Sequence, residues 1–286
     1  MLQQTQVITV IPYFNRFIKN IPDIETLANF DNLKLIKFWE GLGYYSRVRN
    51  LKKAAQVIVK DFNKKLPSNF LKLKSLPGIG DYTASAISAI AFNKPLIPLD
   101  GNIERVLKRY LYLKKENQIR KENLIKQKKI FGTSRRSSDY AQALMELGAL
   151  ICKPKNPLCD QCPISKKCTS FIKKDFTLTK VIKKNRDKYF LLKVYKRNNK
   201  YLLVKNNKFN FLKNLNIFPM NELIKPKNFK QNMSFKMSNM NMSVKIEYNK
   251  MIKAIPYSYW IDPKNLKNYT LPTFTKKIVK YLENHK

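Results

Sequence analysis

The chain has 286 residues, of which 44% are hydrophobic and 12% aromatic, so it can bury a sizeable core in about two domains. Its 57 Lys and Arg residues against 19 Asp and Glu residues give a formal net charge of +38, which favours a polyanionic partner, with nucleic acid as the first expectation. No apolar run reaches the roughly 18 residues of a membrane span and no signal-peptide pattern opens the chain, so we expect a cytoplasmic protein that does not enter a membrane.

The first predicted element is a helix over residues 7–18, where apolar residues recur at helical spacing. Further on, the turn Gly41-Leu42-Gly43 is followed by Tyr44, Tyr45 and Arg47. Tyrosines at a glycine turn beside arginines suit insertion into a base stack with phosphate binding nearby. The alternative is a pair of half-buried core tyrosines whose neighbouring arginines reach to solvent.

A helical hairpin is predicted next. Residues 66–73 and 83–92 read as two helices joined by the tight turn Leu76-Pro77-Gly78-Ile79-Gly80. Gly78 and Gly80 can adopt positive φ and carry no Cβ, so another backbone can approach closely, while the second helix presents free N–H groups and the positive end of its dipole. This predicts a phosphate-binding end. An ordinary corner between two helices is the other interpretation.

Asp100 stands just before a strong helical pattern over residues 103–111. Its carboxylate can serve as a helix cap or as a catalytic group that faces the hairpin from a cleft. The charge-rich stretch 114–129 is predicted to be a solvated helix and linker.

All four cysteines lie within seventeen residues, at Cys152, Cys159, Cys162 and Cys168, with the spacing C-x6-C-x2-C-x5-C. In a chain expected to be cytoplasmic, this indicates a metal site rather than disulfides. Tetrahedral zinc and a [4Fe-4S] cluster both accept four cysteines. Zinc ribbons usually have two C-x2-C pairs and only one is present here, so the spacing favours the cluster.

The last third of the chain has a different pattern. Residues 189–195 and 201–204 flank Arg197-Asn198-Asn199, which predicts a β-hairpin, and residues 244–248 alternate as in a strand. A final helix is predicted from about Thr273.

Together these motifs resemble the helix-hairpin-helix DNA glycosylases that carry a [4Fe-4S] cluster, the endonuclease III superfamily. The resemblance rests on the cysteine spacing, on Leu76-Pro77-Gly78-Ile79-Gly80 and on Asp100. Within the superfamily, the opening Met-Leu-Gln-Gln-Thr-Gln-Val, the run from Trp39 to Arg47 and the run from Ala143 to Ala149 resemble the adenine DNA glycosylase (MutY) family.

The resemblance implies a mainly α glycosylase domain over residues 1–173, which includes the iron–sulfur loop 152–168. A linker over 174–187 and a smaller α+β, Nudix-like domain over 188–286 that reads 8-oxoguanine would follow. No glutamate-rich Nudix box is present, so pyrophosphatase activity is not expected.

The implied chemistry is hydrolysis of the N-glycosidic bond of a flipped-out adenine that is mispaired with 8-oxoguanine or guanine in double-stranded DNA. Asp100 would stabilise the oxocarbenium-like state, supported by Asn102 and Tyr82. The four cysteines would bind a [4Fe-4S] cluster, and the protein would act as a monomer in the bacterial cytoplasm, associated with the nucleoid.

DNA contacts are implied for residues that would fill the base stack, bind the backbone phosphate or read the oxidised base. Where the family has Phe-Ser-His for that reading, this chain has Met237-Ser238-Asn239, so only the serine is carried over. The positions expected to contact DNA are Gln4, Tyr44, Arg47, Gly78, Gly80 and Ser238.

One departure affects the expected activity. The family's glutamate that protonates the departing adenine lies two residues before the position matched by Met1, so we expect this chain as given to be impaired, since such a group is worth about 10²–10⁴-fold. A catalytically impaired mispair-binding protein is therefore one alternative. An endonuclease III-like glycosylase/lyase is another, although Tyr82 stands where the lyases have a lysine.

Overall fold

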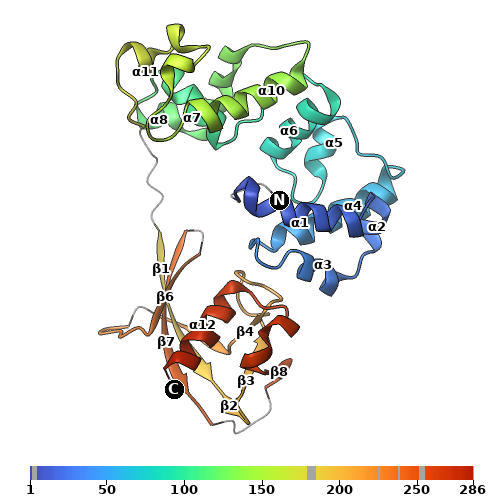
Figure 1. Cartoon of the computed structure of the whole chain (residues 1–286), viewed down its shortest axis with the longest axis vertical. Coiled ribbons are helices and arrows are strands. Elements are labelled where there is room, and N and C mark those ends of the chain that lie inside the picture. The colour runs from blue at the N-terminus through green and yellow to red at the C-terminus, as the bar shows by residue number, and fades with distance from the viewer. Residues whose placement is uncertain (2–4, 179–184, 225, 238, 251–254, 286) are drawn as a thin grey trace. The chain divides into compact units, whose positions relative to one another are not determined.

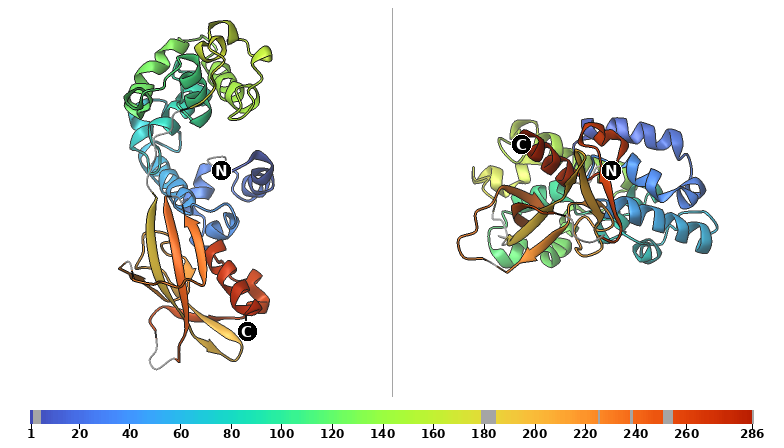
Figure 2. Two further views of the ribbon diagram at one scale, coloured as in Figure 1. Left: turned by 90° about the vertical axis from the view of Figure 1, so that its left-hand side faces the viewer. Right: turned by 90° about the horizontal axis from the view of Figure 1, so that it is seen from below.

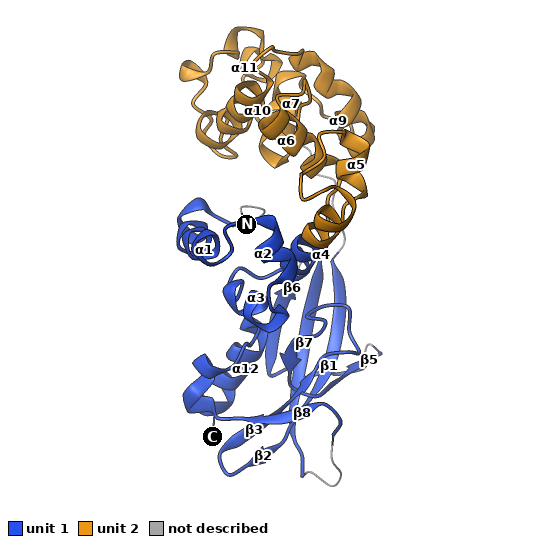
Figure 3. Cartoon of the chain, turned by 90° about the vertical axis from the view of Figure 1, so that its right-hand side faces the viewer, with its two compact units in different colours: residues 1–52, 183–286 blue, residues 53–182 orange. Residues whose placement is uncertain are grey.

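The computed structural model describes all residues except 2–4, 179–184, 225, 238, 251–254 and 286. The chain divides into two compact units (Figure 3): unit 1 comprises residues 1–52 and 183–286, and unit 2 comprises residues 53–182. No helix among the described residues is both long enough and apolar enough to cross a membrane.

The amino-terminal part of unit 1 is helical. Its helices are α1 (Val7–Asn20), α2 (Ile24–Asn29), α3 (Asn32–Phe38) and the first part of α4 (Ser46–Asp61). Asp23 and Asp31 start α2 and α3, because their side chains accept hydrogen bonds from the backbone N–H groups of Thr26 and Lys34. Trp39, at the end of α3, is 2% exposed and packs edge-on against Phe17 of α1.

The carboxyl-terminal part of unit 1 contains two four-stranded sheets (Figure 1). The strands are β1 (Arg186–Val194), β2 (Lys196–Arg197), β3 (Lys200–Lys205), β4 (Asn216–Ile217), β5 (Met220–Leu223), β6 (Met233–Met237), β7 (Met240–Tyr248) and β8 (Ser258–Ile261). One sheet has the order β5-β1-β7-β6, with β1 and β7 parallel. In the other, β3 pairs with β2, β4 and β8.

The predicted hairpin lies between β2 and β3, where Asn198 and Asn199 have φ angles of +47° and +57°, as a two-residue hairpin turn requires. The strand over 186–194 does not pair with β3. It belongs to the other sheet, because its register pairs it with β5 and β7.

Helix α12 (Thr273–Asn284) follows the 3₁₀ helix η5 (Pro263–Asn268) and packs against the strands (Figure 2). Its apolar face is buried together with inward-facing residues of both sheets; fully buried members include Phe190, Val194, Leu203, Val244, Ile261 and Ile278. The expected α+β architecture of this region is confirmed.

The regular structure in the described part of unit 2, residues 53–178, is helical. After the end of α4 come α5 (Phe70–Ser75), α6 (Asp81–Phe92), α7 (Gly101–Tyr110), α8 (Glu116–Ile119), α9 (Lys121–Gln127), η1 (Lys128–Phe131), α10 (Ser137–Glu146), η2 (Leu147–Ile151), η3 (Cys159–Gln161), η4 (Ser165–Lys167) and α11 (Thr169–Ile172). The small-residue helix α6 packs against α5 and α10, and its Ala84, Ser85, Ser88 and Ala89 are buried. A small-residue face permits this close packing.

Two details of unit 2 differ from the sequence-based expectation. The stretch 114–129 is not a solvated helix and linker, because Ile119 and Leu124 are 3% and 1% exposed and join a core cluster with α7. The helix that leads to the cysteines ends in one π-helical turn, η2. Such turns often mark functional sites.

Candidate functional site

The turn between α5 and α6 presents the amino end of a twelve-residue helix. Gly78 has a φ of +80°, in the left-handed region that disfavours side chains. Gly80 has extended backbone, with φ −94° and ψ −178°, so the expectation of positive φ holds for Gly78 alone. No side chain caps the first turn of α6, which leaves its N–H groups and positive dipole end for an anion.

Asp100 is the amino-terminal cap of α7. Its Oδ1 atom accepts hydrogen bonds from the backbone N–H groups of Asn102 (3.0 Å) and Ile103 (2.7 Å), so the capping interpretation is confirmed. Burial raises the pKa of Tyr82, and the negative charge of Asp100 raises it further. The structure thus brings a carboxylate held by two N–H groups within electrostatic reach of a neutral phenol.

Arg105 connects this end of α7 to the segment that leads into the cysteines. Its guanidinium donates hydrogen bonds to Asn102 Oδ1 (2.9 Å), to the carbonyl of Cys152 (2.7 Å) and to the carbonyl of Gly148. Gly148 packs directly on Asn102, because a Cβ at Gly148 would lie 2.6 Å from Asn102 Cβ and 2.9 Å from its carbonyl carbon. Arg105 therefore holds both the side chain of Asn102 and the backbone at Cys152.

The four cysteines line one pocket in unit 2, together with apolar residues such as Leu147, Ile151 and Phe171. Burial raises the pKa of Cys159, and the neighbouring cysteines raise it further; burial likewise raises the pKa of Cys162. Thiols gathered in this way ionise together only when a cation compensates their charge, so the donor set fits a metal centre. Within the described part of the chain, no three His, Cys, Asp or Glu side chains are arranged around the position of a single metal ion.

Arg109 places a fixed positive charge at this pocket. The side chain is 3% exposed, and its Nη1 atom donates to Cys152 Sγ (3.4 Å) and to the carbonyl of Lys153 (2.6 Å). Its Nη2 atom donates to the carbonyl of Pro154 at 2.9 Å. One buried guanidinium therefore holds the start of the cysteine loop by hydrogen bonds to a thiol and to two carbonyls.

The predicted DNA-contacting residues Tyr44 and Arg47 belong to unit 1. Tyr44 is 50% exposed at a φ of +46°, whereas Tyr45 is 6% exposed and belongs to the core. The Arg47 guanidinium lies 5.4 Å from the ring centroids of both Tyr44 and Trp39. Arg47 therefore supports the ring of Tyr44 from one side. Gln4 and Ser238 lie outside the described residues.

Sequence reasoning did not single out Arg105, Arg109 or Gly148. Arg109 could have been found from the sequence, because it falls on the apolar face of α7 beside Val106. An arginine there must have a buried partner, since an unpaired buried charge is costly. For Gly148 the sequence offered only a glycine within a helical pattern, which often has a packing reason.

The comparisons with known proteins point to one family. The family model described as "HhH-GPD superfamily base excision DNA repair protein" matches residues 1–129. The chain is 42% identical over 172 residues to an adenine DNA glycosylase of Buchnera aphidicola subsp. Baizongia pistaciae, covering 60% of this chain and 49% of that protein. It is 36% identical over 231 residues to the adenine DNA glycosylase of Buchnera aphidicola subsp. Schizaphis graminum, covering 77% and 65%.

Among solved structures, a thermostable thymine-DNA glycosylase is similar, with a TM-score of 0.53 and 26% identity over 60% of this chain and 80% of that chain. The chain spans about half to two thirds of the length of the curated relatives named above. The matched region includes the hairpin and Asp100. The chain therefore belongs to the HhH-GPD superfamily and, within it, to the adenine DNA glycosylase (MutY) family.

Proposed function

We propose that this chain is a base-excision repair enzyme that hydrolyses the N-glycosidic bond of adenine mispaired with 8-oxoguanine or guanine. Relatives named adenine DNA glycosylase support the reaction class. The observation that carries the proposal is the Asp100 carboxylate, fixed by two backbone N–H groups at the amino end of α7 and close to Tyr82. A fixed carboxylate stabilises the positive charge that develops on the sugar as the bond breaks.

The roles of the neighbouring residues follow from their contacts. The backbone N–H of Asn102 holds Asp100, and its side chain is fixed by Arg105, so Asn102 is a positioning residue. Tyr82 stays neutral, because burial and the Asp100 charge raise its pKa. A phenol cannot form the Schiff base of a lyase, so water completes the reaction.

Double-stranded DNA is the proposed partner, bound by a monomer. The uncapped amino end of α6 with Gly78 and Gly80 would bind the backbone phosphate, while Tyr44, supported by Arg47, would enter the base stack near the lesion. Gln4 and Ser238 are retained as proposed DNA contacts. We also retain a glycosylase domain over 1–173, a linker over 174–187 and a Nudix-like recognition domain over 188–286.

We assign the four cysteines to a [4Fe-4S] cluster. The shared pocket, the raised thiol pKa values and the Arg109 hydrogen bond to Cys152 support this assignment. When bound, the cluster supplies a covalent cross-link of the loop 152–168. Arg109 and the cysteines then hold that loop, whose lysines, such as Lys153 and Lys166, can face DNA phosphates.

The test is single-turnover adenine release from a duplex that contains adenine opposite 8-oxoguanine. Asn caps a helix as well as Asp does, so Asp100→Asn should keep α7 folded while removing the charge. We expect it to lower the rate by about 10²–10³-fold. Asp31→Asn is the matched control, because Asp31 caps α3 in the same way but lies at no proposed site.

Three outcomes separate the alternatives. Adenine release by the unmodified chain that depends on Asp100 supports the proposal. Tight mispair binding with no release by the unmodified chain would make it a binding protein. Covalent trapping by borohydride would instead indicate a lyase.

A further inference from the structure

An acidic residue occupies the end of the hairpin that should bind a phosphate. Asp81 is the first residue of α6, directly after Gly80. Its Oδ1 atom lies 2.7 Å from Nζ of Lys74, which belongs to α5 on the other side of the turn. Both side chains are about half exposed, at 48% for Lys74 and 55% for Asp81. The ion pair therefore spans the mouth of the hairpin at its solvent-facing surface.

Other lysines surround the same carboxylate. The hydrogen bond from Lys74 lowers the pKa of Asp81 most, and the charges of Lys121 and Lys128 lower it further. Lys128 donates to the carbonyl of Ile97 at 2.7 Å, so its ammonium is fixed in the loop that leads to α7. One negative charge thus stands among three positive charges where the N–H groups of α6 begin.

We propose that Asp81 is an internal anion that competes with the DNA phosphate for Lys74 and for the amino end of α6, and so weakens binding to every duplex. The inference rests on the proposed function in one respect, which is that the hairpin binds DNA. Beyond that function, the inference assigns to Asp81 the role of setting how strongly the hairpin binds a DNA phosphate.

The competition follows from charge and geometry. A phosphate that approaches Gly78 and Gly80 must displace the carboxylate from Lys74 or accept its repulsion. A chain with a formal charge of +38 already binds polyanions through counterion release, so a local negative charge limits the time spent on undamaged DNA. Because phosphates carry no sequence information, the effect should be the same for all duplexes.

The test is the salt dependence of binding to an undamaged duplex, measured with the full chain. Asp81→Asn should free Lys74 for one more phosphate. The logarithmic salt slope should then steepen by about 0.9, which corresponds to about eightfold tighter binding at 0.1 M salt. Lys74→Gln should weaken binding about eightfold in the D81N background and much less in the unmodified chain, because Asp81 occupies Lys74 there.

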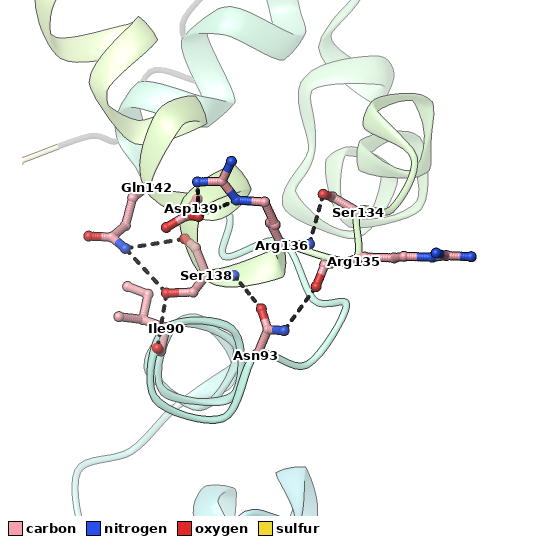
Figure 4. A network of polar contacts seen from close by, with 8 residues as sticks. All are labelled: Ile90, Asn93, Ser134, Arg135, Arg136, Ser138, Asp139 and Gln142. Atoms are coloured by element: carbon pink, nitrogen blue, oxygen red, sulfur yellow. Dashed lines mark hydrogen bonds and ion pairs between the residues drawn. The ribbon is translucent and has the colours of Figure 1, made fainter.

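Asp139→Asn is the matched control. Asp139 also lies in the first turn of a helix of unit 2 and pairs with an arginine, since Arg136 Nη2 is 2.6 Å from Asp139 Oδ2 (Figure 4). Asp139→Asn therefore changes the net charge equally but lies outside the hairpin, and it should leave the slope unchanged. Equal effects of the two substitutions would mean a net-charge effect only and would overturn the proposal.

Unchanged or weaker binding by Asp81→Asn would also overturn it, once urea unfolding shows that the variant is folded. The adenine-release assay is separate from this one. If the chain releases no adenine while Asp81→Asn tightens binding, the catalytic proposal fails and this inference stands. If adenine is released normally while Asp81→Asn leaves the slope unchanged, only this inference fails.

Discussion

Gly148 of η2 packs directly against Asn102 at the start of α7. A Cβ there would lie 2.6 Å from Asn102 Cβ and 2.9 and 3.0 Å from Asn102 backbone atoms, so the neighbouring backbone would have to move. We expect Gly148→Ala to lower the free energy of unfolding by about 1–3 kcal/mol. It should also slow adenine release, because Asn102 holds Asp100. Urea denaturation and the single-turnover assay measure the two effects.

Gly101→Ala is the control for that substitution. Gly101 lies next to Asp100 in the first turn of α7, and a Cβ there would meet nothing within 4 Å. Alanine in a helix should leave stability unchanged or raise it by up to about 1 kcal/mol. A Gly148→Ala variant as stable as Gly101→Ala would contradict the close packing.

At the residue scale, the sequence identified groups whose chemistry depends on local spacing. The cysteines and Asp100 were found in this way, and the structure places the cysteines around one pocket and Asp100 at a helix cap. Arg105 and Gly148 were missed because their contact joins residues 43 positions apart. Such a contact is fixed by how α7 packs on η2, which no local pattern encodes.

At the scale of elements, the two hairpin glycines differ in what an added methyl group would do. Gly80 has extended backbone and open space at its Cβ position, so Gly80→Ala should change the free energy of unfolding by less than about 0.5 kcal/mol. The methyl group would nevertheless stand where a phosphate approaches α6. We expect DNA binding to weaken about three- to tenfold, the loss of about one phosphate contact, in a fluorescence anisotropy titration.

Gly78→Ala should behave differently. Its φ of +80° costs an alanine about 1–2 kcal/mol, so this variant should lose stability as well as affinity. Unchanged affinity of a folded Gly80→Ala variant would contradict phosphate binding at the hairpin.

Helix α7 also joins the proposed catalytic end to the cysteine loop. A lysine cannot reproduce the contacts that Arg109 makes with Cys152 Sγ and with the carbonyls of Lys153 and Pro154. We therefore expect Arg109→Lys to lower the iron and sulfide content per purified chain by at least about half, because the cysteines would be held less firmly in place to bind the cluster. Arg136→Lys, at a side chain that is 83% exposed, should leave both contents unchanged. Equal iron content in the two variants would contradict the role of Arg109.

The elements themselves were predicted well where periodicity is strong, as in α1, α7 and α12. The pairing of strands was not, because alternation identifies a strand but not its neighbour. The strand over 186–194 pairs in parallel with β7, some fifty residues later, and is separate from the β2–β3 hairpin next to it in the sequence. The burial of Ile119 and Leu124 was not predicted either, because the charged residues around them in the sequence indicated a solvent-exposed stretch.

At the scale of the whole molecule, unit 1 joins both ends of the chain, an association that the sequence did not reveal. Glu40, after α3, lies 2.9 Å from Lys37 Nζ and 2.6 Å from Lys276 Nζ of α12, and accepts a hydrogen bond from the Leu271 N–H at 3.3 Å. Its side chain is 11% exposed. Partners more than 230 residues apart are brought together only by the tertiary fold.

This carboxylate should make the stability of unit 1 depend on pH. Burial alone would raise the pKa of Glu40, but hydrogen bonds and charges from Lys276 and Lys37 outweigh it and hold the pKa below its ordinary value of 4.5. A group whose pKa is lower in the folded state stabilises that state above its unfolded pKa, and the contribution is lost as the pH falls through the folded pKa. We expect Glu40→Gln to cost about 1 kcal/mol at pH 7, and the difference from the unmodified chain to shrink as the pH falls below 4.5.

Urea unfolding of both proteins at pH 7 and at about pH 3, below the usual pKa of a glutamate, measures that difference. Glu222→Gln serves as the control, because Glu222 pairs with Lys188 at a surface where both side chains are about 40% exposed, and screening by water leaves such a pair little net energy. A cost at Glu40 that persists undiminished at the lower pH would show that the packing of the side chain, rather than its charge, holds α12 to α3. Loss of the cost at low pH, with no comparable change in the control, would show that the ion pairs of Glu40 help to hold the two ends of the chain together.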